Sequence, residues 1–193
     1  MKHALLAAAA VAALLAPTLS HAQAATVVHP LVGAALTGGG DEITEVRYTD
    51  GSTRKIRAGN LLDIYGGVDV RLGGAPIDIL ATVGYHVDSA GGWNGSLRFE
   101  RYPIEALVLF HPAPAVRFGV GPRYSAGASV KTSGVVDNVG NPHFKSQLGG
   151  VVMGEWLFTP HQGVQVRYVH ETFKLDGMRV DGSHGGVGYT YYF

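Results

Sequence analysis

The chain has 193 residues, a length that fits a single domain. Its 15 Lys and Arg balance 15 Asp and Glu, and this zero net charge excludes the strong positive field of a general nucleic-acid-binding protein. The absence of cysteine excludes disulfides, zinc–thiolate sites, iron–sulfur clusters and a thiol nucleophile, and the charged share of 16% is low for a soluble domain, in which about 25% is usual.

The first two dozen residues are typical of a secretory signal peptide. The short basic start Met1–His3 precedes thirteen consecutive apolar residues, from Ala4 to Ala16. Thirteen are too few for a membrane-spanning helix, which needs about 20. Small residues then fit cleavage after Ala22 or after Ala24. We therefore expect a signal peptide at residues 1–22, or 1–24, then a short segment up to residue 30 and one domain over residues 31–193.

Beyond residue 30 the sequence alternates between apolar and polar residues, as a β-strand does when its side chains point to opposite faces. In residues 77–88, for example, Ile77, Ile79 and Val83 share one face, and Asp78 and His86 share the other. Six more segments show the same period: residues 62–72, 102–110, 116–124, 150–158, 164–169 and 187–193. With residues 31–36 the sequence predicts eight strands.

The first two strands are predicted to form one long hairpin. Residues 31–49 and 53–72 have similar lengths and flank Asp50-Gly51-Ser52, a turn signal between two alternating runs. The outer halves of both arms are charged, so the tip is expected to project beyond the apolar zone that holds the base. Gly38-Gly39-Gly40 interrupts the alternation, and we expect a bulge or kink there.

The connections between the predicted strands alternate in length. Short connections occur at residues 73–76, 112–115 and 160–163, whereas long polar ones occur at residues 89–96, 132–146 and 176–185. Short and long turns therefore lie at opposite ends of the sheet. This arrangement predicts an all-β fold: an eight-stranded antiparallel up-and-down transmembrane β-barrel of the outer membrane, with its tight turns in the periplasm.

Alternation alone also fits a periplasmic lipocalin-like binding protein, in which the apolar face points inward around a ligand. Aromatic residues near both ends of the apolar faces favour the membrane barrel, because such rings prefer the head-group level. The residues predicted to form these two interface belts are Tyr85, Tyr102, Phe110, Phe118, Tyr124, Phe158, Tyr168 and Phe193.

The opposite face of the predicted strands is rich in charge. An Arg exposed to hydrocarbon near the bilayer midplane costs about 2–4 kcal/mol, so these charges are expected to lie inside the barrel and to neutralise one another. The predicted lumenal charge network consists of Asp63, Asp69, Arg71, Asp78, Arg101, Glu105, Arg117, Arg123, Glu155, Arg167 and Glu171.

The chain ends on Phe193, preceded at alternate positions by Tyr191 and Tyr189. Here it resembles the bacterial outer-membrane barrel families, whose last strand ends in an aromatic residue, and in size it is most similar to the OmpA/OmpX-type barrels. The resemblance implies the outer membrane of a Gram-negative bacterium, a monomer, and recognition of the C-terminal strand by the barrel assembly machinery. Outer-membrane lipids and lipopolysaccharide are the further partners that it implies.

Side chains just fill the interior of an eight-stranded barrel, so we expect no water channel. The expected function is structural or surface-interacting, through the hairpin tip, the loop with Trp93 and the loop at residues 135–144, with an extracellular ligand that the sequence does not specify. No cofactor and no nucleic-acid partner are expected. No metal site is expected either, because the nine His include no His-x-His pair.

An outer-membrane enzyme that modifies the acyl chains of lipid A or phospholipids is the alternative. Acyl transfer needs a hydroxyl nucleophile, a His base and an orienting carboxylate. His86, Asp88 and Ser89 are the candidates, near the outer rim. Their spacing is not that of the His-x-Ser pair of the lipid A deacylases, and a row of polar lumenal side chains explains His86 and Asp88 equally well. No catalytic residue is therefore assigned.

Overall fold

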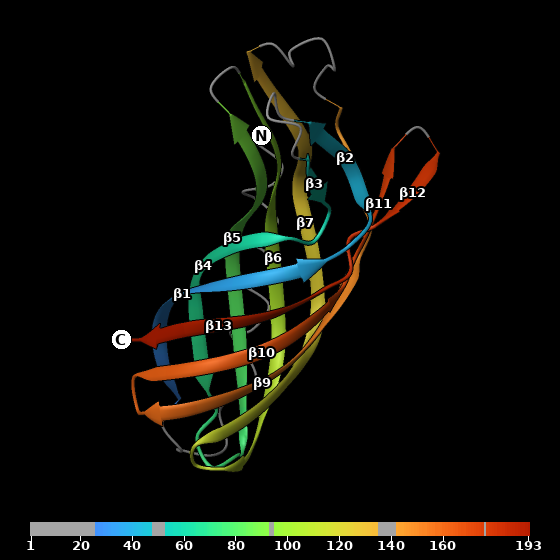
Figure 1. Ribbon diagram of the computed structural model, residues 1–193. Coiled ribbons are helices and arrows are strands. Elements are labelled where there is room, and N and C mark those ends of the chain that lie inside the picture. The colour runs from blue at the N-terminus through green and yellow to red at the C-terminus, as the bar shows by residue number, and fades with distance from the viewer. Residues whose placement is uncertain (1–25, 48–52, 93–94, 135–141, 176) are drawn as a thin grey trace.

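The computed structural model describes residues 26–47, 53–92, 95–134, 142–175 and 177–193. Eight strands form a closed barrel in the order β1-β13-β10-β9-β7-β6-β5-β4, and every neighbouring pair is antiparallel (Figure 1). The predicted fold is therefore confirmed. The barrel strands are β1 (Val27–Gly39), β4 (Leu61–Arg71), β5 (Ile77–Gly92), β6 (Gly95–Ala113), β7 (Val116–Gly134), β9 (Gly149–Thr159), β10 (Gln162–His170) and β13 (His184–Tyr192).

The barrel closes where the first strand meets the last. β1 pairs with β13 from Leu31 opposite Tyr192 to Gly39 opposite His184, and the amide of Phe193 donates to the carbonyl oxygen of Pro30. β1 begins at Val27, four residues earlier than expected, because the residues before Leu31 already pair with the end of β4. Residues 27–30, half of the segment 23–30 predicted to precede the barrel, therefore belong to its first strand.

The two ends of the barrel differ as expected, but the long connections contain more strand than the sequence predicted. The three short turns lie at one end, between β4 and β5, between β6 and β7, and between β9 and β10. At the other end β5, β6 and β7 continue as a tall wall beyond the other barrel strands (Figure 1). The loop predicted at residues 89–96 is mostly part of this wall, because main-chain pairing of β5 with β6 continues to Gly92 and Gly95.

Two small sheets lie at the same outer end. One joins β2 (Glu42–Arg47) to β3 (Thr53–Arg57), and the other has the order β12-β11-β8, from β8 (Lys145–Ser146), β11 (Thr172–Leu175) and β12 (Met178–Asp181). The long connections predicted at residues 132–146 and 176–185 therefore contain strand at β8 and β12. Strands of two to four residues are too short for alternation to reveal, since pairing alone defines them.

The predicted long hairpin is present, with the predicted kink. Gly39 and Gly40 have φ values of 137° and 75°, and Leu61 on the returning arm has a φ of 78°. Beyond this kink the arms continue as β2 and β3. β3 contacts β5 and β6, and Ile56 and Ala58 are fully buried. The hairpin therefore packs against the tall wall, because its few apolar side chains are shielded from water there.

Buried apolar residues form two separate clusters. One lies inside the barrel and includes Leu31, Leu107 and Met153. The second, which we name the apolar cap, lies at the outer end between the small sheets and the tall wall. Phe144 belongs to it and is buried, which corrects its expected place in a surface loop. The fully packed members of the cap are Ile56, Ala58, Leu97, Phe99, Ala128, Val130, Phe144 and Phe173.

Candidate functional site

The outside of the barrel is apolar, as the sequence predicted. Valine, isoleucine and aromatic side chains on every barrel strand point outward, and seven of the eight predicted interface aromatics are 42% to 60% exposed. Tyr85 is only partly exposed, because its hydroxyl donates to Glu100 at 3.0 Å. Trp156 and Tyr189, which the sequence analysis did not place in a belt, lie on the same outer surface. A surface of this composition matches hydrocarbon rather than water.

Ten of the eleven residues of the predicted charge network are buried inside the barrel: Asp63, Asp69, Asp78, Arg101, Glu105, Arg117, Arg123, Glu155, Arg167 and Glu171. Arg71 is the exception. Its side chain is 46% exposed at the end of β4, where it lies 3.6 Å from Asp78. Arg71 therefore belongs to the rim of the barrel, because alternation gives the face on which a side chain lies but not its depth.

Arg117 is the centre of the network near the tight turns. It donates from Nη1 to Asp69 at 2.6 Å and from Nε to Glu155 at 2.8 Å, and its Cζ lies 4.6 Å from the centre of the Tyr192 ring. The Tyr192 hydroxyl also donates to Glu155, at 2.8 Å. Asp78 is held at 2.5 Å from Nε2 of His111. One guanidinium thus links β4, β7, β9 and the closing strand β13.

A second network lies nearer the outer end. Glu105 accepts hydrogen bonds from Arg167 at 2.5 Å and from Arg123. Arg123 also lies 3.4 Å from Asp63, and its Nε lies 3.6 Å from Glu171. Arg123 and Arg167 therefore each have a carboxylate neighbour, which a charge shielded from water needs.

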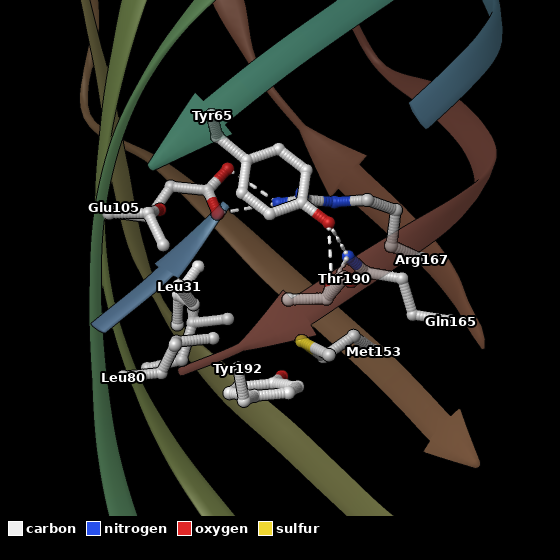
Figure 2. A pocket seen from close by; sticks show the side chains of 11 residues that line it. Leu31, Tyr65, Leu80, Glu105, Met153, Gln165, Arg167, Thr190 and Tyr192 are labelled. Carbon is white, nitrogen blue, oxygen red and sulfur yellow. Dashed lines mark hydrogen bonds and ion pairs between the residues drawn. The ribbon is translucent and has the colours of Figure 1, made fainter. Parts of the chain in front are cut away.

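Uncharged polar side chains lie beside Glu105 and Arg167 of the second network (Figure 2). The hydroxyl of Tyr65 lies 2.8 Å from Oγ1 of Thr190 and accepts from Gln165, above the side chains of Leu31 and Met153. The cavity here measures about 10 Å³, which holds one water molecule at most. Tyr65 and Gln165 belong to the alternating segments 62–72 and 164–169, but neither carries a charge, so the alternation indicated no role for them.

Two of the three weak catalytic candidates, His86 and Asp88, are tied to the base of the hairpin, whereas Ser89 lies on β5 opposite Arg98 of β6. His86 is fully buried, and its Nε2 lies 3.0 Å from the Thr37 hydroxyl and 3.1 Å from the carbonyl oxygen of Asn60. Asp88 accepts a hydrogen bond from the amide of Arg57 at 2.8 Å. These partners fix β3 over the barrel mouth. His86 and Asp88 thus contact a hydroxyl and main-chain groups at the base of the hairpin.

His184 is a buried residue whose role sequence reasoning missed. It was expected in a loop, but it begins β13, and its ring centre lies 4.9 Å from that of His86 in an edge-on contact. Its Nδ1 lies 2.7 Å from the carbonyl oxygen of Gly182. The two histidines together lie where the charged interior meets the apolar cap. They lie on β5 and β13, which are not neighbours in the barrel, so the closure of the barrel brings them together and no local pattern indicated their contact.

Outside the barrel, two ionisable groups have shifted pKa values. The ion pair with Glu42, at 2.7 Å, raises the pKa of Lys55 on the β2–β3 hairpin. Hydrogen bonds from Ser183 lower the pKa of Asp181 at the end of β12, where the Ser183 amide donates to the carboxylate at 2.8 Å. Both shifts favour the charged forms at neutral pH, so these loops carry fixed charges there.

Several predicted features lie outside the described residues: the signal peptide, the hairpin tip at residues 50–52, Trp93, and residues 135–141 of the long loop. Within the described ranges, no group of three or more His, Asp or Glu side chains could hold a metal ion. Among the same residues, no helix has the length and apolar character needed to cross a membrane.

No protein-family model matches the chain, and no curated protein matches it. Solved structures that match include Ail, the attachment invasion locus protein of Yersinia pestis, with 15% identity, a TM-score of 0.49, and coverage of 86% of this chain and 97% of that one. Neisserial surface protein A matches with 13% identity, a TM-score of 0.48, and coverage of 88% and 99%. The outer membrane protein AlkL matches with 12% identity, a TM-score of 0.42, and coverage of 92% and 94%.

The chain's own geometry defines its class. Eight antiparallel strands close on one another, apolar side chains cover the outside, and ion pairs fill the inside. By strand order and by the distribution of its side chains, the protein has the fold of the small outer-membrane β-barrels.

Proposed function

We propose that the protein is a non-conducting barrel of the bacterial outer membrane with a structural or surface-interacting role carried by its outer end. One observation carries this proposal: the interior is filled by two ion-paired networks, and the apolar cap covers it on the outer side. An aqueous path would need a polar, open lumen. Here the fully buried Phe99 and Phe173 lie over the charged interior instead.

The outer-membrane location is supported by the apolar exterior and by the N-terminal leader pattern. We expect the mature chain to begin after Ala22 or Ala24 and to fractionate with the outer membrane. Intact-mass measurement of the purified protein tests the cleavage, and sucrose-gradient separation of the two membranes tests the location. A mature chain that is soluble and monomeric without detergent would contradict the proposal.

Conductance measurements test the closed interior. The refolded mature protein, inserted into planar bilayers, is expected to give no stable conductance steps. The matched variant is Phe173→Ala, which opens the cap but keeps every charged side chain of both networks, and it is also expected not to conduct. Regular steps from the wild-type protein would show that water passes through the barrel and would overturn the proposal.

Assembly through the last strand is part of the same proposal. Tyr189 and Phe193 are exposed on the lipid-facing side of β13 and at the chain end, where the assembly machinery would meet them. Removing Phe193 is expected to reduce the amount of folded barrel in cells. Refolding of the purified protein in detergent micelles should change far less. Equal losses in both settings would assign Phe193 to barrel stability instead.

A further inference from the structure

The small sheet β12-β11-β8 carries three basic side chains in a single transverse row. Lys174 in the central strand β11 pairs directly with Lys145 of β8 on one side and with Arg179 of β12 on the other. Directly paired residues of antiparallel strands point to the same face of a sheet. All three residues are exposed, so the row faces away from the protein. We name these three residues the cationic row.

The opposite face of this sheet holds it in place. Phe173, between Thr172 and Lys174, is fully buried in the apolar cap, and Leu175 and Val180 pack against the same cluster. The hydroxyl of Ser146 donates to the main-chain carbonyl of Ser125 on the tall wall. Because the inner face is anchored, the outward direction of the cationic row is set by the fold.

The row is a concentration of like charge that the fold does not neutralise. Directly opposed residues have their Cβ atoms about 4.5–5.5 Å apart, and like charges at this spacing are destabilising. Among the described residues, no carboxylate forms an ion pair with any member of the row. Asp181, on the same face, accepts from the amide of Ser183. The amide of Asp181 in turn donates to the Asp41 carboxylate at 2.8 Å, so both carboxylates at this end of β12 accept main-chain hydrogen bonds. The three cations therefore remain available to an anion from outside.

The row lies beyond the outer edge of the apolar surface. The lipid-facing side of β10 runs through Val166 and Tyr168, and the chain then passes through the buried Glu171 into β11, where Lys174 lies six residues beyond Tyr168. On the neighbouring chain segment, Leu148 is 76% exposed only three residues after Lys145. Apolar contact for acyl chains and positive charge for head groups therefore follow each other on one side of the molecule.

We propose that the cationic row binds the phosphate groups of an anionic glycolipid in the outer leaflet. Lysine ammonium groups bind phosphate as point charges, and an Arg guanidinium donates to it in bidentate fashion. A lipid rather than a soluble polyanion is favoured because the exposed Leu148 follows Lys145 by only three residues and because the chain leads from the apolar face of β10 to Lys174. This inference rests on the proposed outer-membrane location, and it adds the chemical class of a partner.

Binding to defined lipids tests the proposal. The triple variant Lys145→Gln, Lys174→Gln, Arg179→Gln removes the row. Its control, Lys55→Gln, Arg57→Gln, Arg98→Gln, removes the same charge from the hairpin and the tall wall. Both proteins and the wild type are placed in phosphatidylcholine nanodiscs that contain phosphorylated or dephosphorylated lipopolysaccharide. Lipid retained by the barrel is measured by native mass spectrometry at low and high salt.

We expect the row variant to retain phosphorylated lipopolysaccharide at least about ten-fold more weakly than the wild type at low salt, with a smaller difference at high salt. The control variant is expected to retain phosphorylated lipopolysaccharide as well as the wild type does. The wild type and the row variant are expected to differ little in their retention of the dephosphorylated lipid. Equal retention by the wild type and the row variant would overturn the proposal, and so would equal losses in the row and control variants.

A soluble polyanion is the remaining source of phosphate, and inositol hexaphosphate serves as its probe. If it displaces the lipid from the wild type at concentrations near those of the lipid itself, the lipid assignment is wrong. Heat-modified gel mobility of each variant checks that the barrel has folded. If the protein inserts into nanodiscs but the wild type retains the lipid no better than the row variant, the proposal for the row is wrong and the proposed membrane location stands. If the mature chain folds without lipid or detergent, both proposals are wrong.

Discussion

The guanidinium carbon of Arg101 lies 5.5 Å from the centre of the Phe173 ring, and this contact joins the charged interior of the barrel to the apolar cap. The same carbon lies 5.4 Å from the Phe99 ring, and Nε of Arg101 lies 3.3 Å from Glu171. A cation that is shielded from water gains more from an aromatic face than an exposed one does. Arg101 thus faces both parts of the structure, so the cap and the outer charge network are expected to stabilise each other.

Truncation of Phe173 tests this connection. Phe173→Ala removes the ring from the middle of the apolar cap and from the face of Arg101, and it should cost about 3–5 kcal/mol of the stability of the outer end. We expect the small sheets to become sensitive to limited proteolysis while the barrel keeps its heat-modified gel mobility. Phe158→Ala, at a lipid-facing position, is the control and should leave proteolysis of the outer end unchanged. Protection equal to that of the wild type would show that Phe173 does not hold the cap.

Removal of Arg117 tests the network near the tight turns. Arg117→Gln leaves the buried carboxylates of Asp69 and Glu155 without their main cationic partner, a change that costs about 3–5 kcal/mol at a buried ion pair. The temperature at which the folded band converts to the unfolded band on gels should fall clearly. Arg98→Gln, at an exposed position, should leave it unchanged. If both variants convert at the wild-type temperature, the network is not needed for stability.

The same network predicts non-additive losses. Glu155→Gln alone leaves Arg117 with Asp69 as a partner, and the double variant with Arg117→Gln removes both charges of one pair. Residues in direct contact show coupling energies of about 0.5–3 kcal/mol, so the double variant should be less destabilised than the sum of the two single variants. Strict additivity would show that the two side chains act independently.

Alternation predicted the barrel because burial on one face and lipid on the other select residue types at every second position. It therefore identified eight strands and the inward direction of charges such as Glu105 and Arg123. It did not identify which charges pair. Arg167 reaches Glu105 from a strand that is not its neighbour in the barrel, and this contact depends on the stagger of strands around the closed sheet.

The outer end could not be predicted in the same way. Phe144 and Phe173 are separated by the whole β9–β10 hairpin, and their rings pack 6.5 Å apart only because β8 pairs with β11. Lys145 and Lys174 become neighbours through the same pairing. A single aromatic residue in a polar loop is an ordinary feature of a sequence, so neither the apolar cap nor the cationic row leaves a local pattern.

Asp181 predicts a pH dependence at the outer end. Hydrogen bonds from Ser183 lower the pKa of this carboxyl below its usual value of 3.8. Ionised Asp181 therefore contributes stability that is complete above 3.8 and is lost as the pH falls through the lower folded-state value. Carboxyl ¹³C shifts in micelles should give a midpoint below 3.8, and Ser183→Ala should raise it. Ser89→Ala, on another strand, should have no effect, and a midpoint at 3.8 in the wild type would contradict the shift.

Tyr65 lies so close to Gly33 that even a methyl group at residue 33 is expected to destabilise the barrel. A Cβ on Gly33 would overlap the Tyr65 ring, which crosses β1 from β4 to reach Thr190 on β13. Gly33→Ala should displace the ring and break its hydrogen bond to Thr190, at a cost of about 1–3 kcal/mol. Gly150→Ala is the matched control, because its Cβ would meet only a carbonyl oxygen at 3.9 Å.

Urea unfolding in detergent micelles measures these differences in stability. The effect of Gly33→Ala should be much smaller in a Tyr65→Leu background, because the shorter side chain leaves room for the methyl group above β1. This rescue separates the steric explanation from a general intolerance of β1 to substitution. If Gly33→Ala is equally costly with and without the Tyr65 ring, the ring is not what requires glycine at this position, and the closing strands must be held together in another way.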